Sequence, residues 1–214
     1  MEAMAQAVHQ GRGVRRKTKW EELLLLASAR GGLFSAHEAH TIGLTRQGLQ
    51  HHLRRGAIFR VARGIYRIPN MAVRPHESLV CAWLHFKDDA TVSHGSALAL
   101  HGLSVKPAVH QLTTAYTRWR RRRVPRDVEL HFAPLTWRDL TYVDGLPVTL
   151  VLRTLVDCHH SSMDPERVDE ACARAVERDL VDAGRLTSAR AAPRWLRPPL
   201  PRAPPSGRSR RRHR

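Results

Sequence analysis

The pattern of apolar and polar positions is most informative over residues 33–69, where it predicts two short helices followed by a two-strand hairpin. Ser35 followed by Glu38 has the spacing of a capping box, which starts a helix at this serine. Gly43 supplies the positive φ that a tight turn needs, and Thr45 can cap a second helix. Helix, turn, helix and hairpin in this order predict a winged helix-turn-helix.

The second of these helices, expected to run to about Arg55 before Gly56, separates apolar from polar side chains. At 100° per residue, Leu49 and Leu53 fall on one stripe that faces a core. An adjoining arc carries polar side chains: Gln47, Gln50, His51 and Arg54. Glutamine can pair bidentately with adenine and arginine with guanine. The pattern therefore predicts a helix that reads base edges in DNA.

The hairpin has the composition of a basic wing. Residues 58–61 and 65–68 alternate apolar and polar positions around Arg63-Gly64, which is a turn signal. Contacts with the DNA backbone are expected from four arginines: Arg46, Arg60, Arg63 and Arg67. For any single arginine an ordinary solvated charge is the alternative. The agreement of fold, polar arc and wing favours DNA binding for the set.

Charge is distributed unevenly along the 214 residues and supports this interpretation. Residues 1–75 carry 13 Lys and Arg against 4 Asp and Glu, a net of +9. Residues 76–187 carry 14 against 15, and residues 188–214 carry 9 against none. A near-neutral middle between two basic pieces is typical of a protein that binds a polyanion.

The same patterns divide the chain. We expect a loose basic arm over residues 1–17, a winged helix-turn-helix over 18–69, a linker over 70–75, a mixed domain over 76–187, and a disordered Arg/Pro-rich tail over 188–214. The mixed domain is predicted to hold helices over 77–86, 96–100 and 153–158, a last helix starting at Asp164-Pro165, and strands at 91–92, 109–113, 128–132 and 146–151. The fold class is therefore α+β.

The tail has two interpretations. It holds six of the thirteen prolines and nine arginines, with few large apolar residues, so it cannot build a core. It is either a nucleic-acid-binding tail or the product of a shifted reading frame in GC-rich coding sequence. The abrupt change of composition after a well-formed helix favours the second.

Cysteines and apolar runs narrow the class of protein. Cys81, Cys158 and Cys172 lack the spacing of a zinc site, and their scatter indicates a reducing compartment. We expect no metal and no cofactor. The apolar run at 23–27 is too short for a signal peptide, and no stretch reaches membrane-spanning length. A cytoplasmic protein without a membrane partner is expected.

Three motifs resemble the AbiEi-type antitoxins of type IV toxin–antitoxin systems and their stand-alone bacterial relatives. The winged segment closes on RVARGIYRIP at residues 60–69, similar to the family's vrrGvYrlP. SHGSALALHGL at residues 93–103 is similar to SHxSAAxLHGL. GLPVT at 145–149 with RTLVD at 153–157 is similar to GlPVT…RTLvDla. Together these motifs extend the resemblance over residues 20–186.

The resemblance implies a transcriptional regulator that represses its own operon by binding inverted repeats in double-stranded DNA. It also implies a second domain that opposes a nucleotidyltransferase toxin. Inverted repeats suggest two copies on DNA, although no dimer seam is evident in the sequence. The alternative is a toxin-binding interaction protein whose DNA affinity is non-specific.

Polar residues of the second domain permit a catalytic interpretation, which we do not favour. Ser93, His94, His101 and Asp157 could form a nucleophile, base and acid. Ser93 lacks the GxSxG surroundings of a nucleophile elbow. His94 and Ser96 are better suited to capping the next helix. With an intrahelical Arg153–Asp157 ion pair expected from the i, i+4 spacing, the protein is not expected to be an enzyme.

A run of arginines interrupts the near-neutral domain at residues 118–126. Its possible contact residues are Arg118, Trp119, Arg120, Arg121, Arg122 and Arg123. Guanidinium groups bind phosphate, and the tryptophan could stack on a base. Binding of an acidic protein partner, or simple solvation of a loop between two strands, are the alternatives.

Overall fold

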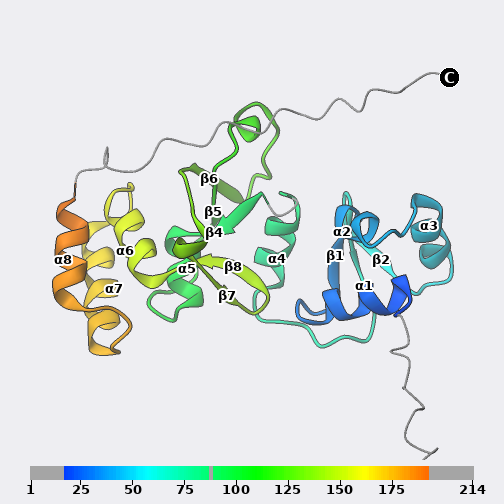
Figure 1. Cartoon of the computed structure of the whole chain (residues 1–214), viewed down its shortest axis with the longest axis horizontal. Helices are drawn as coiled ribbons and strands as arrows, with labels where there is room; N and C mark the ends of the chain where they lie inside the picture. The colour runs from blue at the N-terminus through cyan, green and yellow to red at the C-terminus, as the bar shows by residue number, and fades with distance from the viewer. Residues whose placement is uncertain (1–16, 87–88, 193–214) are drawn as a thin grey trace, which may run out of the picture.

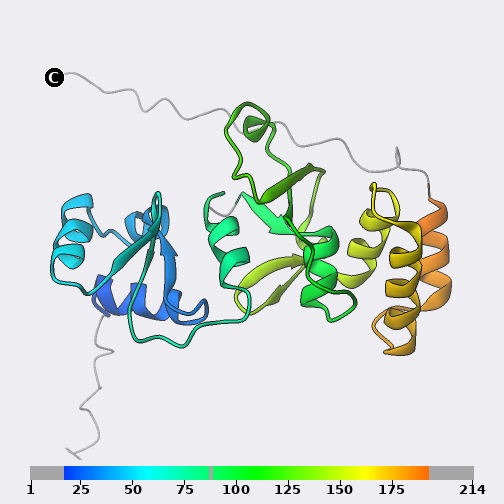
Figure 2. The same ribbon diagram turned by 180° about the vertical axis from the view of Figure 1, so that it is seen from behind.

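The computed structural model describes residues 17–86 and 89–192. Figures 1 and 2 show an elongated molecule with the N-terminal elements at one end, the large sheet in the middle and the C-terminal helices at the other end. Helix α4 (Glu77–Leu84) lies between the N-terminal part and the large sheet. The expected α+β class is confirmed. The expected basic arm, except for Lys17, and most of the expected tail lie outside the described residues.

The N-terminal part has the helices and hairpin of a winged helix-turn-helix. Its elements are α1 (Lys19–Ser28), β1 (Leu33–Ser35), α2 (Ala36–Thr41), α3 (Arg46–Arg54), β2 (Phe59–Ala62) and β3 (Ile65–Arg67). The three strands form an antiparallel sheet in the order β1-β3-β2. Strand β1 was not predicted, because three residues before a helix cap are too short to show alternation.

Local chemistry explains where these helices begin and turn. The Ser35 hydroxyl accepts a hydrogen bond from the Glu38 amide at 3.1 Å, and the Glu38 carboxylate accepts one from the Ser35 amide at 2.8 Å. The expected capping box is therefore present. Gly43 has a φ of 90° at the turn, and the Thr45 hydroxyl accepts from the Gly48 amide at the start of α3. Gly56, with a φ of 67°, follows the end of α3.

The second part is a five-stranded sheet with helices packed on it. The strands of the sheet are β4 (Ala90–Val92), β5 (His110–Thr114), β6 (Val128–Phe132), β7 (Leu140–Val143) and β8 (Leu146–Thr149), and helix α5 (His94–Leu100) connects β4 to β5. After the sheet come α6 (Val151–His159), α7 (Pro165–Glu177) and α8 (Ala183–Ala191), and two short 3-10 helices lie at η1 (Thr117–Arg121) and η2 (Trp137–Asp139). The strand order is β6-β5-β4-β8-β7. Strand β4 runs parallel to β8, and β5 runs parallel to β6.

The large core is continuous with the N-terminal sheet. Leu33 of β1 and Ile65 of β3 are buried in the same cluster as Trp83 of α4 and the apolar side chains of the large sheet. A separate cluster of buried side chains joins α5 to α6, α7 and α8. Because burial of apolar area is the main stabilising contribution, the winged part is packed against the rest of the molecule through α4.

Two expectations about α5 were wrong, namely that it begins at residue 96 and that His94 and Ser96 cap it. Helix α5 begins at His94 with Ser93 as its N-cap residue, and this N-cap makes no side-chain capping bond. The Ser96 hydroxyl instead accepts from the Gln111 amide of β5 at 2.9 Å. His94 has a φ of 50°. These side chains tie α5 to the sheet rather than capping it.

The boundary between the folded part and the expected disordered tail, predicted at residue 188, was also wrong. Helix α8 continues to Ala191, so residues 188–191 are helical where a disordered tail was expected. Asp182 caps this helix through the Arg185 amide, and Leu186 is buried. Arg190 donates to Asp169 of α7 at 2.8 Å. The charge of Arg190 thus has a folded partner that composition alone did not indicate.

Candidate DNA interface

Helix α3 keeps its apolar side chains inward and its polar arc in solvent. Leu49 is 6% exposed and Leu53 is half-buried. The four side chains of the polar arc are all exposed: Gln47, Gln50, His51 and Arg54. A side chain can reach a base edge only if it is not already packed or bonded within the protein. The polar arc therefore has the exposure that base contact requires. Arg46, at the first position of α3, is exposed as well.

The inner face of α3 is fixed against α1. The ring of His52 stacks on Trp20 of α1 with centroids 4.1 Å apart and planes inclined by 11°. Burial lowers the pKa of His52, and the nearby charges of His51 and Arg55 lower it further. The stack of the imidazole on the indole fixes the orientation of α3 relative to α1. A helix that contacts a ligand needs such a fixed orientation if its side chains are to be preorganised for binding.

The wing carries exposed arginines at its tip and an exposed apolar face. Arg63 is exposed beside Gly64, whose φ is 77°. Arg60 is exposed, and its Nε donates to the Ala62 carbonyl at 3.2 Å, next to an irregularity in the pairing of β2 with β3. Phe59 and Val61 are 47% and 41% exposed. Neither residue was predicted at the surface, although their i, i+2 spacing places Phe59 and Val61 on one face of the strand, opposite Arg60.

Arg67 was expected at the DNA backbone, and the structure places it elsewhere. Its guanidinium NH1 lies 2.7 Å from both carboxylate oxygens of Glu77 in α4, and its NH2 contacts the Met71 carbonyl at 3.5 Å. The Arg67 side chain is 12% exposed. We therefore assign it to the contact between the wing and α4, because a largely buried ion pair with both carboxylate oxygens leaves it little reach toward a ligand.

A groove beside the wing tip adds histidines to the basic surface. The groove has a volume of about 470 Å³ and runs between Arg63-Gly64, α2 and the end of α4. His37 and His40 of α2 line it together with His85. Among the described residues that line this groove, none is a carboxylate. The sequence analysis did not single out these histidines, although the i, i+3 spacing of His37 and His40 places them on one face of α2.

The arginine run lies on a loop whose aromatic residue is buried. Trp119 is 4% exposed, and its Nε1 donates to Asp89 at 2.9 Å. The expectation that Trp119 stacks on a base was therefore wrong, because its ring packs edge-on against Phe86 at 4.8 Å. The side chain of Arg118 lies outside the described residues.

The following arginines are exposed and partly oriented by this core. Arg120, Arg121, Arg122 and Arg123 are all exposed. The Arg120 guanidinium lies 4.3 Å from the centre of the Phe132 ring, and that of Arg122 lies 5.2 Å from the Trp119 ring. Stacking on a ring holds a guanidinium by its face and leaves its N–H edge free to donate.

Polar residues of the second part form a buried network rather than an open catalytic site. Ser93 is fully buried, and its hydroxyl accepts from Thr113 Oγ1 at 2.8 Å and lies 3.0 Å from His94 Nδ1. The His94 ring stacks on His131 at 3.6 Å. His101 instead contacts the Thr149 carbonyl at 2.8 Å. A fully buried hydroxyl that is already hydrogen-bonded is poorly placed to attack a substrate.

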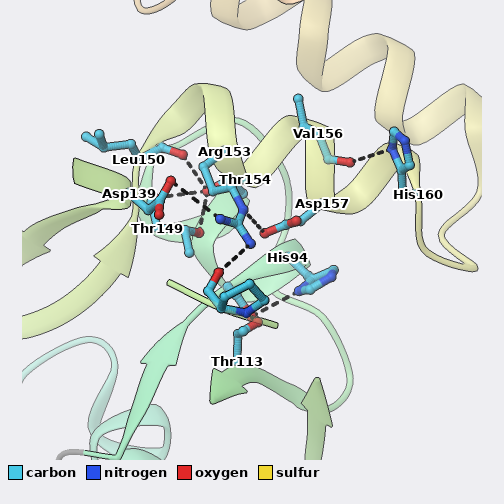
Figure 3. Close-up of polar contacts among 12 residues, drawn as sticks. His94, Thr113, Asp139, Thr149, Leu150, Arg153, Thr154, Val156, Asp157 and His160 are labelled. Carbon is cyan, nitrogen blue, oxygen red and sulfur yellow. Dashed lines mark hydrogen bonds and ion pairs between the residues drawn. The ribbon is translucent and has the colours of Figure 1, made fainter. Parts of the chain in front are cut away.

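Arg153 holds a separate part of this network together, as Figure 3 shows. Its Nε donates to Asp157 at 2.9 Å, its NH1 lies 3.4 Å from Asp139, and its NH2 donates to the Pro134 carbonyl at 3.3 Å. Asp157 is 3% exposed. The expected Arg153–Asp157 ion pair is confirmed within α6, and the contact of Arg153 with Asp139 joins α6 to η2.

Metal-binding clusters and membrane-spanning helices are both absent from the part of the chain that the structure describes. Within residues 17–86 and 89–192, no group of three or more His, Cys, Asp and Glu side chains is arranged to hold a metal ion. Among the helices of the same ranges, none has both the length and the apolar character that a bilayer crossing requires.

Similarity to known proteins is found at two levels, a solved structure and a protein family. A comparison with solved structures matches the chain to the crystal structure of the RV2827C protein from Mycobacterium tuberculosis, with 16% sequence identity and a TM-score of 0.41, covering 83% of this chain and 82% of that chain. None of the curated proteins matches the chain. Residues 21–69, which contain most of α1, all of α3 and the wing, match the model described as transcriptional regulator, AbiEi antitoxin, so the family resemblance is confirmed on this segment.

Proposed function

We propose that the protein is a transcriptional regulator of the AbiEi antitoxin type that binds operator DNA through α3. The observation that carries the proposal is the exposed polar arc of α3 above a buried leucine. Gln50 and Arg54 are one helical turn apart, so both can enter one major groove and address neighbouring base pairs. Gln47 and His51 extend the same arc.

Three arginines are proposed to contact phosphates of the DNA backbone beside this helix. Arg46 is at the N-terminus of α3, whereas Arg60 and Arg63 are on the wing. All three are exposed, and among the described residues no carboxylate pairs with them. Phosphate contacts of this kind fix the register of a protein on duplex DNA without reading sequence. Arg67 is left out of this set because of its pairing with Glu77.

The arginine loop is proposed as a further phosphate contact. His85 lines the groove at the wing tip and also lies 5.9 Å from Trp119, measured between ring centroids. The loop is therefore connected to the wing through one side chain. Figures 1 and 2 both show the wing hairpin and the η1 loop projecting toward the same edge of the molecule. An acidic protein surface is the competing ligand for Arg120–Arg123.

Repression of its own operon at inverted repeats, with two copies on the DNA, is the finer part of the proposal. It is supported by the family match over residues 21–69. The same match supports an antitoxin role in which the second part of the chain opposes a nucleotidyltransferase toxin. We place no catalytic step in this protein.

A second candidate function is protein binding with only non-specific DNA affinity. Trp137 and Tyr142 are 78% and 74% exposed near β7, which is an edge strand of the large sheet. Exposed aromatic residues are typical anchors of protein interfaces. A toxin could therefore bind at this edge, and the two functions are distinguished by the sequence preference for DNA.

The test is a fluorescence-anisotropy titration against the DNA upstream of the gene and against a scrambled duplex of equal length, over a series of salt concentrations. A specific regulator should prefer the upstream DNA by about 10³-fold or more. Equal affinity for the two duplexes, falling steeply with salt, would leave a non-specific basic protein and favour the second candidate.

A separate variant tests whether the arginine loop contacts DNA phosphates. Replacing Arg120–Arg123 with alanine should weaken binding to both duplexes and reduce the magnitude of the salt slope by up to about 0.9 for each phosphate that the variant no longer neutralises. The ratio between the two affinities should stay unchanged. Unaltered DNA binding by this variant would assign the loop to an acidic protein or to solvent.

A further inference from the structure

A cleft between the winged part and the large sheet has no role in the function proposed above. It has a volume of about 460 Å³, which is within the range of small-molecule sites. One wall comes from α1 and α2, with Leu26 and Ile42, and the other comes from the sheet, with Leu140 and Pro147. Such a cleft between two packed parts of a chain is a preferred place for ligands.

The two walls meet closely at the end of α1. Gly145, in the turn between β7 and β8, has a φ of 76°. A Cβ atom at this position would lie 3.3 Å from the Ala29 Cβ and 3.3 Å from the Arg30 Cγ. Glycine therefore allows the turn to approach α1 directly. The cleft is defined by tight backbone packing on this side and is open on the other, where Tyr142 is exposed.

A buried ion pair lines the cleft. Arg30 NH1 lies 2.7 Å from Glu38 Oε1, and both side chains are more than nine-tenths buried, at 7% and 8% exposure. The Arg30 guanidinium also lies 5.2 Å from the centre of the Trp83 ring. Within the described residues, Arg30 NH1 makes no well-directed hydrogen bond. A guanidinium has five N–H donors, so this pair has donors to spare at the cleft.

The charge of the pair decides which ligand suits it. Arg30 and Glu38 neutralise each other, so an anion entering the cleft would bring an uncompensated buried charge, which is costly. Glu38 Oε2 already accepts from the Ser35 amide and hydroxyl, so the pair presents the remaining Arg30 donors next to the remaining lone pair of Glu38 Oε1. An uncharged planar molecule with an acceptor and a donor on one edge complements both, and the Trp83 and Tyr142 rings with the apolar walls suit its faces.

We propose that this cleft binds an uncharged planar heterocycle of the nucleobase class, held edge-on by Arg30 and Glu38. Its occupant would contact α2 of the winged part and β7 of the sheet at once. The site is independent of DNA binding, so the proposal stands or falls without the function proposed above.

Isothermal titration calorimetry on the full chain tests this, with adenine, hypoxanthine, cytosine and uracil as the probes. At least one base should bind with a Kd below about 1 mM, and sodium benzoate, planar but anionic, should bind about tenfold more weakly or not at all. Absence of binding by all four bases, or tighter binding of benzoate, would overturn the proposal.

Two variants at the cleft and one control on α7 locate the binding. Thr41→Trp fills the mouth of the cleft from α2 and should abolish the heat of binding, whereas Glu166→Trp places the same side chain on an exposed face of α7 and should leave it unchanged. Tyr142→Ala removes an exposed ring at the rim and should weaken binding about tenfold without disturbing the fold. Binding that survives both Thr41→Trp and Tyr142→Ala, with folding verified by circular dichroism, would place the base elsewhere and overturn the assignment.

Discussion

Helix α3 and the Arg153 network use the same kinds of side chain in opposite ways. On α3, glutamine, histidine and arginine stand in solvent above a buried leucine. Around Arg153, arginine and aspartate are turned inward, and each guanidinium nitrogen has a partner within 3.4 Å. Both segments carry motifs that drew attention in the sequence. Polar residues that the fold already satisfies stabilise it, whereas those that it leaves exposed are available to a ligand.

The largest effect is expected when a partner of Arg153 is removed from the buried network. Asp157→Ala leaves Arg153 half-compensated by Asp139, and we expect a loss of about 3 kcal/mol in the free energy of unfolding. Urea denaturation measures this loss. Asp169→Ala, which removes the exposed partner of Arg190, is the matched control and should cost at most about 1 kcal/mol.

The same variant should leave the DNA surface intact. Once the folded fraction of Asp157→Ala is taken into account, its affinity for the upstream duplex should equal that of the wild type. A variant that kept its stability but lost DNA binding would show that the network acts in recognition, and the contrast with α3 would fail.

Substitutions on α3 should have the reverse signature. Gln50→Ala and Arg54→Ala should each cost about 1–3 kcal/mol of discrimination at a single base-pair position. Binding to a panel of singly substituted duplexes gives this quantity. The unfolding free energy should change by less than about 0.5 kcal/mol, because both side chains are exposed. Uniform weakening across the panel would reassign these residues to the DNA backbone.

The wing offers a comparison between two arginines four residues apart. Arg63→Ala should weaken all duplexes alike and reduce the magnitude of the salt slope by about one unit. Arg67→Ala should leave that slope unchanged and lower stability instead, because its partner is Glu77 rather than phosphate. Anisotropy titrations at several salt concentrations separate the two outcomes, and equal slopes for both variants would contradict the assignment.

The sequence predicted local structure well where residues within a few positions of one another determine it. The Ser35–Glu38 capping box, the turn at Gly43 and the Asp164 cap at the start of α7 depend on neighbours within a few positions. The exposed arc of α3 followed from helical periodicity alone. The sequence therefore indicated which residues of α3 face solvent.

What was missed depends on partners distant in sequence. The position of the Arg67 side chain is determined by its ion pair with Glu77, and that of Trp119 by its hydrogen bond to Asp89, 30 positions away. A run of arginines shows its charge but not which aromatic ring beside it is buried. The cleft at Arg30 could not be predicted either, because its two walls meet only when Gly145 packs against α1.

The smallest expected effect concerns pH, and it tests whether buried histidines act as structural groups. Burial lowers the pKa of His110 from 6.5, the nearby Lys106 charge lowers it further, and Asp127 opposes the shift. The folded state therefore binds fewer protons than the unfolded state near pH 6, so the free energy of unfolding falls as the pH falls through 6.5.

For His110→Gln this decline should be shallower, by at most about 1.4 kcal/mol per pH unit. Urea denaturation of both proteins between about pH 8 and pH 5 gives the two slopes. Because His110 is 6% exposed at the start of β5, away from α3, DNA affinity per folded molecule should be unaffected by the substitution at either pH. A steeper decline in the variant would mean that the charged imidazole stabilises the fold, and His110 would then belong with the satisfied charges around Arg153 rather than with the neutral core.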